Sequence, residues 1–187
     1  EIEEYKTVKL KKHFHKMKQV IYSILEKPFM QACLEKEKQE DALYKHSLRT
    51  TLLAISMGIK KKYSFLNLEY LAMAAMLHDI GMGKQFQEAD MEHSFQGFIK
   101  VRENLDLDML IALVCLQHHE RFDGHGGPMG LGKMQITEFA RLISVADYYD
   151  RLIMQKYTPR QSVFKIIAGK GTLFDPEMVV LFQKVMY

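Results

Sequence analysis

The sequence places a histidine–aspartate pair at the end of its most apolar helical segment. His78 and Asp79 follow residues 68–77, and Gly81 ends the segment. A carboxylate at the mouth of a buried helix is costly unless a cation compensates its charge. A divalent metal ion is such a cation, and imidazole together with carboxylate suits Zn, Mn or Fe. An isolated pair of this kind is more often a capping histidine beside a solvated aspartate, so the pair alone indicates little.

Several other segments supply the same residue types at helix ends or on buried helix faces. These further candidates are His46, His93, His118, His119, Asp147 and Asp150. Asp150 follows Asp147 by three positions and therefore shares its helix face. Each residue alone has an ordinary explanation, either as a satisfied core histidine or as a charged residue at a helix end. Because several apolar helices each supply a ligand-type residue, the combined pattern favours a metal centre.

Apolar residues recur at spacings of three and four along most of the chain, which predicts helices. The predicted helices span residues 3–26, 28–38, 40–61, 68–78, 90–103, 107–119, 137–154 and 159–169, with a last helix from Pro176. Asn67 is expected to cap the fourth helix, and the glycine-rich stretch 124–132 is expected to form a long loop. No segment alternates as a strand does, so the predicted fold class is all-α.

The composition is that of an ordinary globular protein. The 187 residues are 48% hydrophobic and 26% charged, and the net charge of +3 is too small to indicate a nucleic-acid polymer as a partner. No apolar stretch is long enough to span a bilayer. Cys33 and Cys115 give no disulfide framework, which is typical of a reducing cytoplasm. The chain begins at Glu1 rather than at methionine, which fits a fragment with a partner domain upstream.

The ordered motifs of the chain resemble the HD superfamily of phosphohydrolases. Within it they are similar to the HD-GYP proteins, which hydrolyse the bacterial messenger cyclic di-GMP. The motifs are His46, Leu77–Gly81, Glu92-His93 with Gly97, His118–Pro128 and Ala140–Asp150. The resemblance implies an all-α, HD-domain helical bundle over residues 41–187. Residues 1–40 precede it and are interpreted as a helical connector or dimerisation segment, with plain packing onto the core as the alternative.

The resemblance also implies a centre of two divalent metal ions. One ion would be bound by His46, His78, Asp79 and Asp147, and the other by Asp79, His93, His118 and His119. Fe or Mn is expected, with Zn or Ni as alternatives. Two divalent ions outweigh the two carboxylates, so the centre stays positive and suits an anionic phosphodiester. Asp79 and Lys84 are expected to act in catalysis. Arg121 and Asp150 are expected to contact substrate or support the ligands, with ordinary ion pairs as the alternative.

The sequence departs from the HD-GYP pattern around these ligands. The triplet 126–128 is Gly-Gly-Pro and lacks the signature tyrosine, and Met82 replaces the usual lysine, for which Lys84 is the candidate substitute. The segment 80–92 is shorter than the corresponding loop of most members. Ala42 stands where a glutamate gives some members a third metal, so a two-metal centre is expected.

Three functional hypotheses follow from the resemblance and its departures. The leading one is a cyclic-di-GMP phosphodiesterase in bacterial signalling, weakly active, that produces pGpG or GMP and is controlled by an upstream sensory domain, a signalling protein or homodimerisation. The second is a catalytically impaired cyclic-dinucleotide receptor or protein-interaction module that retains the metal centre. The third is an HD phosphohydrolase that acts on another nucleotide or phosphoester.

Overall fold

A computed structural model describes residues 2–37, 41–82, 91–103 and 107–187 of the chain. The helices are α1 (Ile2–Leu25), α2 (Pro28–Glu37), α3 (Asp41–Lys60), α4 (Phe65–Leu77), α5 (Glu92–Arg102), α6 (Met109–Gln117), α7 (Glu138–Met154), α8 (Pro159–Ala168) and α9 (Pro176–Met186), with a short 3₁₀ turn at Lys133–Gln135. The described part of the chain contains no β-strand, apart from one isolated bridge between Lys170 and Phe174. The predicted all-α class is confirmed.

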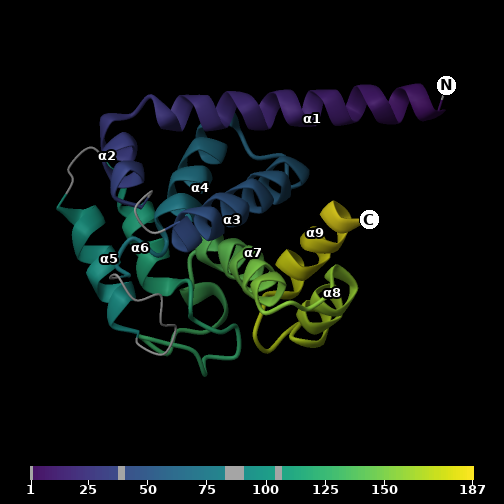
Figure 1. Ribbon diagram of the computed structural model, residues 1–187. Helices are drawn as coiled ribbons and strands as arrows, with labels where there is room; N and C mark the ends of the chain where they lie inside the picture. Colours follow the sequence, from purple (N-terminus) through teal and green to yellow (C-terminus); the bar gives the residue numbers. More distant parts are fainter. Residues whose placement is uncertain (1, 38–40, 83–90, 104–106) are drawn as a thin grey trace.

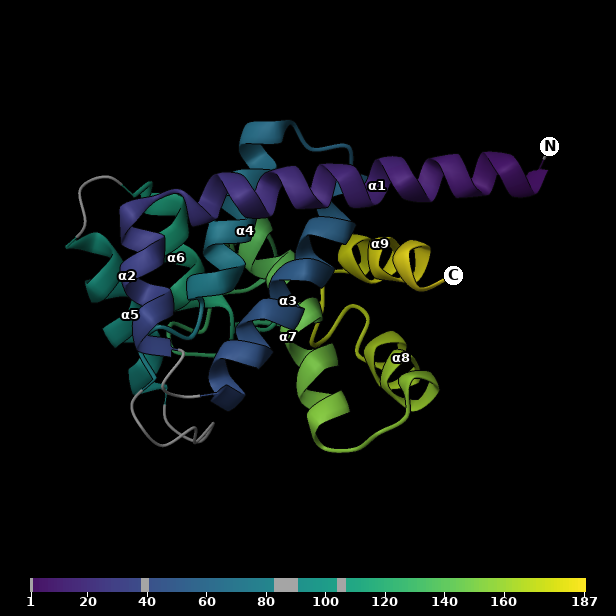
Figure 2. The ribbon, with the colours of Figure 1, turned by 45° about the horizontal axis from the view of Figure 1, so that its top comes forward.

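Helices α3, α4, α6 and α7 form the centre of the bundle. Figures 1 and 2 show α1 lying along one side of this group, with α5 and α2 at one end and α8 and α9 at the other. Helix α4 packs against α1, α3, α6 and α7. Residues 71–77 of α4 are therefore all buried, which explains why this helix is apolar nearly all round.

Side chains at the helix starts fix where the chain turns into the bundle. Thr158 and Asp175 cap α8 and α9, and each of these helices has a proline in its first turn. Proline favours this position because its fixed backbone angle suits the start of a helix. The predicted start of α4 at Asn67 is wrong. Ser64 is the N-cap, and its hydroxyl accepts a hydrogen bond from the Asn67 backbone amide at 3.1 Å. Helix α4 thus begins one turn earlier, with the largely exposed Phe65 and Leu66 in its first turn.

The N-terminal segment shares the hydrophobic core of the bundle. Met17, Val20 and Ile24 of α1 and Met30 of α2 are buried in one cluster with the residues of α3 and α4. Helices α1 and α2 thus pack onto the domain, while the role of residues 1–40 as a connector or dimerisation segment stays a prediction. Across the described ranges, none of the helices combines the length and apolarity that a membrane crossing requires.

Candidate metal centre

Helices α3, α4 and α7 bring together four potential ligands that we call the inner site: His46, His78, Asp79 and Asp147. His46 comes from α3, His78 and Asp79 follow the last residue of α4, and Asp147 lies within α7. All four are buried, with 0–4% of their surface exposed. His46 Nε2 lies 2.9 Å from Asp147 Oδ1, and His78 Nε2 lies 3.4 Å from Asp79 Oδ2. Their ligand atoms all lie within 4.8 Å of one another.

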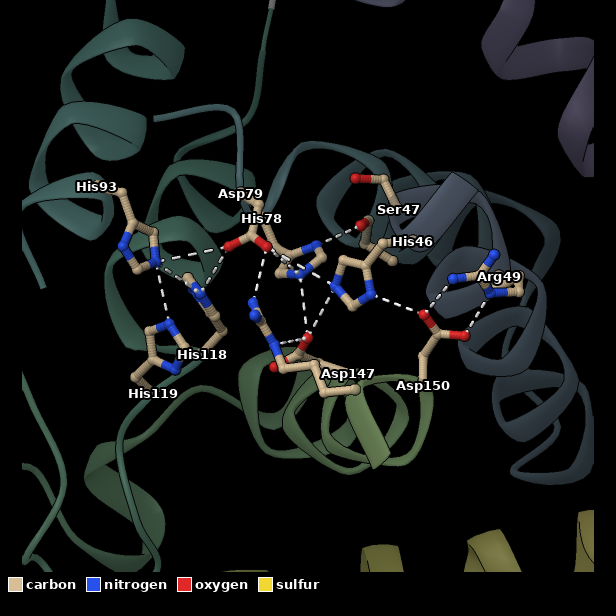
Figure 3. Close-up of polar contacts among 12 residues, drawn as sticks. His46, Ser47, Arg49, His78, Asp79, His93, His118, His119, Asp147 and Asp150 are labelled. Atoms are coloured by element: carbon tan, nitrogen blue, oxygen red, sulfur yellow. Dashed lines mark hydrogen bonds and ion pairs between the residues drawn. The ribbon is translucent and has the colours of Figure 1, made fainter. Parts of the chain in front are cut away.

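A second group, which we call the outer site, consists of Asp79, His93, His118 and His119. His93 is supplied by α5, whereas His118 and His119 follow the end of α6. His118 Nε2 and His93 Nε2 lie 3.2 and 3.5 Å from the other carboxylate oxygen of Asp79. Figure 3 shows these three rings on one side of Asp79, with His46 and Asp147 on the other side. Asp79 therefore offers one oxygen to each site.

The histidine rings are held so that one nitrogen of each faces the centre. The Nδ1 atoms of His78 and His118 lie 2.7 and 2.8 Å from the carbonyl oxygen three residues earlier. His46 Nδ1 lies 2.7 Å from Asp150 Oδ2. When Nδ1 carries the proton and donates it to these oxygens, Nε2 presents a lone pair to the centre. Metal-binding histidines are commonly oriented in this way.

The two sites differ in the ionisation of their imidazoles. Burial opposes protonation of His78, but the neighbouring carboxylates of Asp79 and Asp147 raise its pKa to about 10. In the outer site, burial and the charge of His118 lower the pKa of His119 to about 2. Burial would raise the pKa of Asp79, but His78 and His118 hold it well below its ordinary value. The inner site therefore attracts positive charge, whereas His119 stays neutral.

Asp150, an expected substrate contact, lies behind His46 and away from the centre. Its carboxylate accepts hydrogen bonds from His46 Nδ1 at 2.7 Å and from Arg49 at 2.6 and 2.9 Å, as Figure 3 shows. Burial would raise the pKa of Asp150, but the hydrogen bonds from His46 and Arg49 lower it. This arrangement favours the other predicted role of Asp150, support of a ligand.

The position of His93 depends on close packing between α5 and the chain that follows Asp79. A β-carbon added at Gly81 would lie 1.9 Å from the carbonyl oxygen of His93 and 2.5 Å from the amide nitrogen of Gly97. Only glycine allows this approach, so close packing requires Gly81, whereas α4 already ends at Leu77. The same packing sets His93 opposite His118 and His119.

Arg121 lies at a small pocket beside the centre. The pocket has a volume of about 100 Å³ and is lined by His118, His119, Glu120, Arg121, Ser144, Asp147, Tyr148, Leu173 and Phe174. Arg121 pairs with Asp123 at 2.6 and 3.1 Å, and 39% of its side chain is exposed. Arg121 is thus an accessible, positively charged group at the edge of the ligand cluster.

The three remaining histidines lie outside the two ligand groups. His13 is half-buried and lies 3.4 Å from Ser56 Oγ, and His15 is exposed. His125 sits in the glycine-rich loop with 80% of its side chain exposed. Lys84, the expected catalytic lysine, falls outside the described residues.

Sequence reasoning overlooked Arg151 and Glu120. Arg151 is buried on α7, one turn beyond Asp147, and its guanidinium reaches both carboxylates of the inner site. Glu120 is also buried, and its carboxylate accepts hydrogen bonds from the backbone amides of Met129 and Leu131 at 2.6 and 2.9 Å. The spacing of four between Asp147 and Arg151 could have indicated the first pair. No local feature of the sequence indicates the contacts of Glu120.

The residues of both sites fit divalent metal ions. Metal–ligand bonds of about 2.0–2.2 Å allow two ligands of one ion to lie up to roughly 4.4 Å apart, close to the spread within each group. His78 Nε2 and Asp79 Oδ1 are buried and have no hydrogen-bond partner among the described residues. Imidazole nitrogens and carboxylate oxygens suit Fe, Mn and Zn alike. The fold and site thus define a protein, all-helical in its described part, with two buried histidine–aspartate groups that could each hold a metal ion.

Comparison with known proteins gives this class a name. The family model of the HD domain matches residues 43–152, more than half of the chain. The chain belongs to the HD domain family, and the resemblance to its cyclic-di-GMP phosphodiesterases is confirmed.

Curated relatives match most of this chain but extend well beyond it. A cyclic di-GMP phosphodiesterase of Pseudomonas aeruginosa is 27% identical over 184 residues, covering 88% of this chain and 44% of the relative. A cyclic di-GMP phosphodiesterase of Vibrio cholerae is 31% identical over 182 residues, covering 80% of this chain and 37% of the relative. The chain spans less than half the length of the curated relatives it matches.

Solved structures share the fold. An HDG"Y"P protein from Bdellovibrio bacteriovorus has a TM-score of 0.66 at 21% identity, covering 77% of this chain and 52% of that one. The HD domain of a Listeria monocytogenes phosphodiesterase has a TM-score of 0.60 at 15% identity, covering 82% of this chain and 94% of that one. At these identities the likeness establishes the fold alone.

Proposed function

We propose that this domain is a metal-dependent phosphodiesterase that hydrolyses cyclic di-GMP to pGpG or GMP. The observation that carries the proposal is the pair of ligand groups joined by the two oxygens of Asp79. The named activity of the curated relatives supports the choice of substrate. Fe or Mn is the proposed metal. The predicted role of residues 1–40, as a connector to a sensory domain or as a dimerisation segment, stays part of this proposal.

The chemistry divides between the metal centre and the surrounding side chains. Two bound divalent ions would supply Lewis acidity toward a phosphoryl oxygen and lower the pKa of a bound water. Asp79 would be a ligand in both sites, because each of its oxygens faces a different histidine group. His118 and His119 line both the centre and the adjacent pocket, so the scissile phosphodiester would lie against them.

The pocket limits how the substrate is held. A volume of about 100 Å³ admits one phosphodiester group, whereas sites that enclose a whole drug-sized ligand have about 300–1,000 Å³. The rest of a cyclic dinucleotide would therefore lie across the surface beside the pocket. Arg121 is accessible there and can form a bidentate pair with a phosphate group through two parallel hydrogen bonds.

Hydrolysis by the metal-loaded protein tests the proposal. The protein is purified without oxygen, loaded with Mn²⁺ or Fe²⁺, and incubated with cyclic di-GMP under reducing conditions while pGpG and GMP are measured. We expect product with the wild-type protein and none with Asp79→Ala. Absence of product from wild-type protein that contains two metal ions would refute the proposal.

A panel of substrates tests the specificity. One relative is named a 3′3′-cGAMP-specific phosphodiesterase, and a similar HD domain was solved with cyclic-di-AMP. Cyclic di-GMP, 3′3′-cGAMP, cyclic di-AMP and nucleoside mono- and triphosphates are therefore compared at equal concentration. The highest kcat/KM for cyclic di-GMP is expected. A preference for the nucleoside phosphates would instead support a phosphohydrolase of different specificity.

A cyclic-dinucleotide receptor that retains the metal centre is the second candidate. Its support is the replacement of substrate-facing family residues by Met82 and by the triplet 126–128, while the ligand groups are intact. Binding of cyclic di-GMP to the metal-loaded protein without hydrolysis would favour this function. Turnover that Asp79→Ala abolishes would exclude it.

A further inference from the structure

Arg151 introduces a fixed positive charge into the inner site. It lies on α7 one turn beyond Asp147, with 6% of its surface exposed. Its Nε donates a hydrogen bond to Asp147 Oδ1 at 2.7 Å, and a terminal nitrogen donates to Asp79 Oδ2 at 2.8 Å. A guanidinium stays protonated in proteins and has no lone pair with which to bind a metal ion. It therefore acts on these carboxylates only as a cation and a donor.

The two oxygens that Arg151 contacts are those that face the inner histidines. Asp147 Oδ1 lies 2.9 Å from His46 Nε2 and 3.5 Å from His78 Nε2. Asp79 Oδ2 lies 3.4 Å from His78 Nε2. A metal ion at the inner site would need these same oxygens. It would also meet the repulsion of a unit positive charge within a few ångströms, in a buried region where charges interact strongly.

In the outer site, the described neighbours of the Asp79 oxygen are imidazoles. The outer oxygen of Asp79 faces His118 at 3.2 Å and His93 at 3.5 Å. His119 Nε2 lies 3.0 Å from His93 Nε2, so it belongs to the same cluster of imidazoles. The inner site thus has a guanidinium bound to its carboxylate oxygens. The ligand types alone do not require this difference between the two sites.

We propose that Arg151 is a built-in competitor for the inner metal ion, so that the outer site fills first and tightly and the inner site fills second and weakly. Without the inner ion, the guanidinium compensates Asp79 and Asp147. Binding of that ion requires the guanidinium to leave the two carboxylate oxygens. Metal supply then determines whether the centre holds one ion or two. The inference rests on the metal centre of the proposed function and not on its hydrolytic activity.

Metal titration of the protein tests this competition. Chelator-treated protein is titrated with Mn²⁺ by calorimetry, and bound metal is counted by elemental analysis after dialysis. We expect one tight and one weak step in the wild-type protein. In Arg151→Met, which keeps the side-chain length and loses the charge, the weak step should tighten by about tenfold to a hundredfold. Arg151→Lys keeps a positive charge and should keep the weak step.

Arg141 provides a matched control on the same helix. It is buried, pairs with Asp175 and donates to the Ile136 carbonyl at 3.1 Å, away from the metal centre. Arg141→Met should lower the thermal midpoint with and without metal and leave both binding steps unchanged. Arg151→Met should lower the midpoint only in the metal-free protein, and Mn²⁺ should restore it.

Two ligand variants keep the proposal testable if Arg151→Met does not fold without metal. With Arg151 in place, His93→Gln should remove the tight step and His46→Gln the weak one. The reverse assignment would overturn the proposal, as would an Arg151→Met titration that matches the wild type or loses a step. None of these measurements uses a nucleotide, so a protein that binds metal in this order without hydrolysing cyclic di-GMP would refute the proposed function alone.

Discussion

The inner and outer sites share Asp79 and differ in almost every other respect. The inner site is fully buried and draws on two carboxylates, which raise the pKa of His78 and attract Arg151. The outer site has three imidazoles, borders a pocket, and contains the half-buried His119 with a lowered pKa. The number of carboxylates explains the difference, because buried negative charge must be matched by protons, a guanidinium or a metal ion.

The histidines also differ in what orients their rings. His78 and His118 are oriented by carbonyl groups of their own helix end. His46 is oriented by a side chain, Asp150, which is held in turn by Arg49 of α3. A side-chain support can be changed by mutation without altering the backbone, so the inner site is the easier of the two to perturb selectively.

Removal of the shared ligand should have the largest effect. Asp79→Ala takes one carboxylate oxygen from each site and leaves Arg151 with one partner fewer. We expect the metal content to fall from two ions to none and hydrolysis to fall by about a thousandfold or more, which corresponds to roughly 4 kcal/mol of barrier. Elemental analysis and product assays measure these losses.

A carboxylate outside the centre serves as the control for this variant. Asp175 is buried, pairs with Arg141 and caps α9 through the Glu177 amide at 2.7 Å. Asp175→Asn should cost about 1–3 kcal/mol of stability and leave both metal ions in place. A two-metal Asp79→Ala protein would contradict the bridging role.

Weakening the support of His46 should separate the two sites. Asp150→Asn keeps an oxygen near His46 Nδ1 but removes the negative charge that strengthens that hydrogen bond. Loss of such a support typically lowers metal affinity by about 10–100-fold. We expect this loss in the weak calorimetric step only.

Glu120→Gln makes the same chemical change in a carboxylate that holds loop backbone instead of a ligand. Both calorimetric steps should survive this control variant. If Asp150→Asn weakened the two steps equally, the inner and outer sites would not be separately supported.

Disturbing the backbone beside His93 should act on the outer site. Gly81→Ala places a β-carbon 1.9 Å from the His93 carbonyl, so α5 must shift. Overpacking of this kind costs about 1–3 kcal/mol, and the tight metal step should weaken. Gly97→Ala on the same helix meets the Cys115 β-carbon at 3.2 Å and should have a smaller effect. Urea unfolding and calorimetry give both quantities, and an unchanged tight step in Gly81→Ala would argue against His93 as a ligand.

The sequence predicted the elements and the candidate ligands well for a physical reason. Apolar periodicity marks buried helices, and polar residues at their ends, such as His78 and His118, stand out against that background. The apolar pattern also placed Asp147 in a buried segment, and in the structure this residue is buried beside His46.

What the sequence did not predict depends on contacts between distant segments. The role of Asp150 required knowing that α3 passes behind α7, because His46 and Asp150 are 104 positions apart. Arg151 was overlooked because charge pairs at a spacing of four are usual on exposed helix faces, where they contribute little. Only the packing of α4 against α7 shows that this pair is buried and reaches Asp79.

The pH dependence of metal-free stability should distinguish the two sites most finely. The folded-state pKa of His78 is raised to about 10 from an ordinary value near 6.5, so its stabilising contribution is complete below pH 6.5 and is lost as pH rises through 10. The contribution of His119 to stability depends on pH in the opposite direction. Its pKa of about 2 means that the unfolded chain binds a proton below pH 6.5 and the folded chain does not, so acidification destabilises the fold.

Each histidine variant should therefore flatten one side of the stability profile. Urea unfolding of chelator-treated protein is measured at about pH 5.5, 6.5 and 8.5, where one group contributes at most about 1.4 kcal/mol per pH unit. Compared with wild type, His78→Gln should lose less stability from 6.5 to 8.5, and His119→Gln should lose less from 6.5 to 5.5. The exposed His125→Gln should follow the wild-type curve on both sides. If both ligand variants flattened the same side, the inner and outer imidazoles would share one electrostatic environment, and the contrast between two carboxylates and one would not govern their protonation.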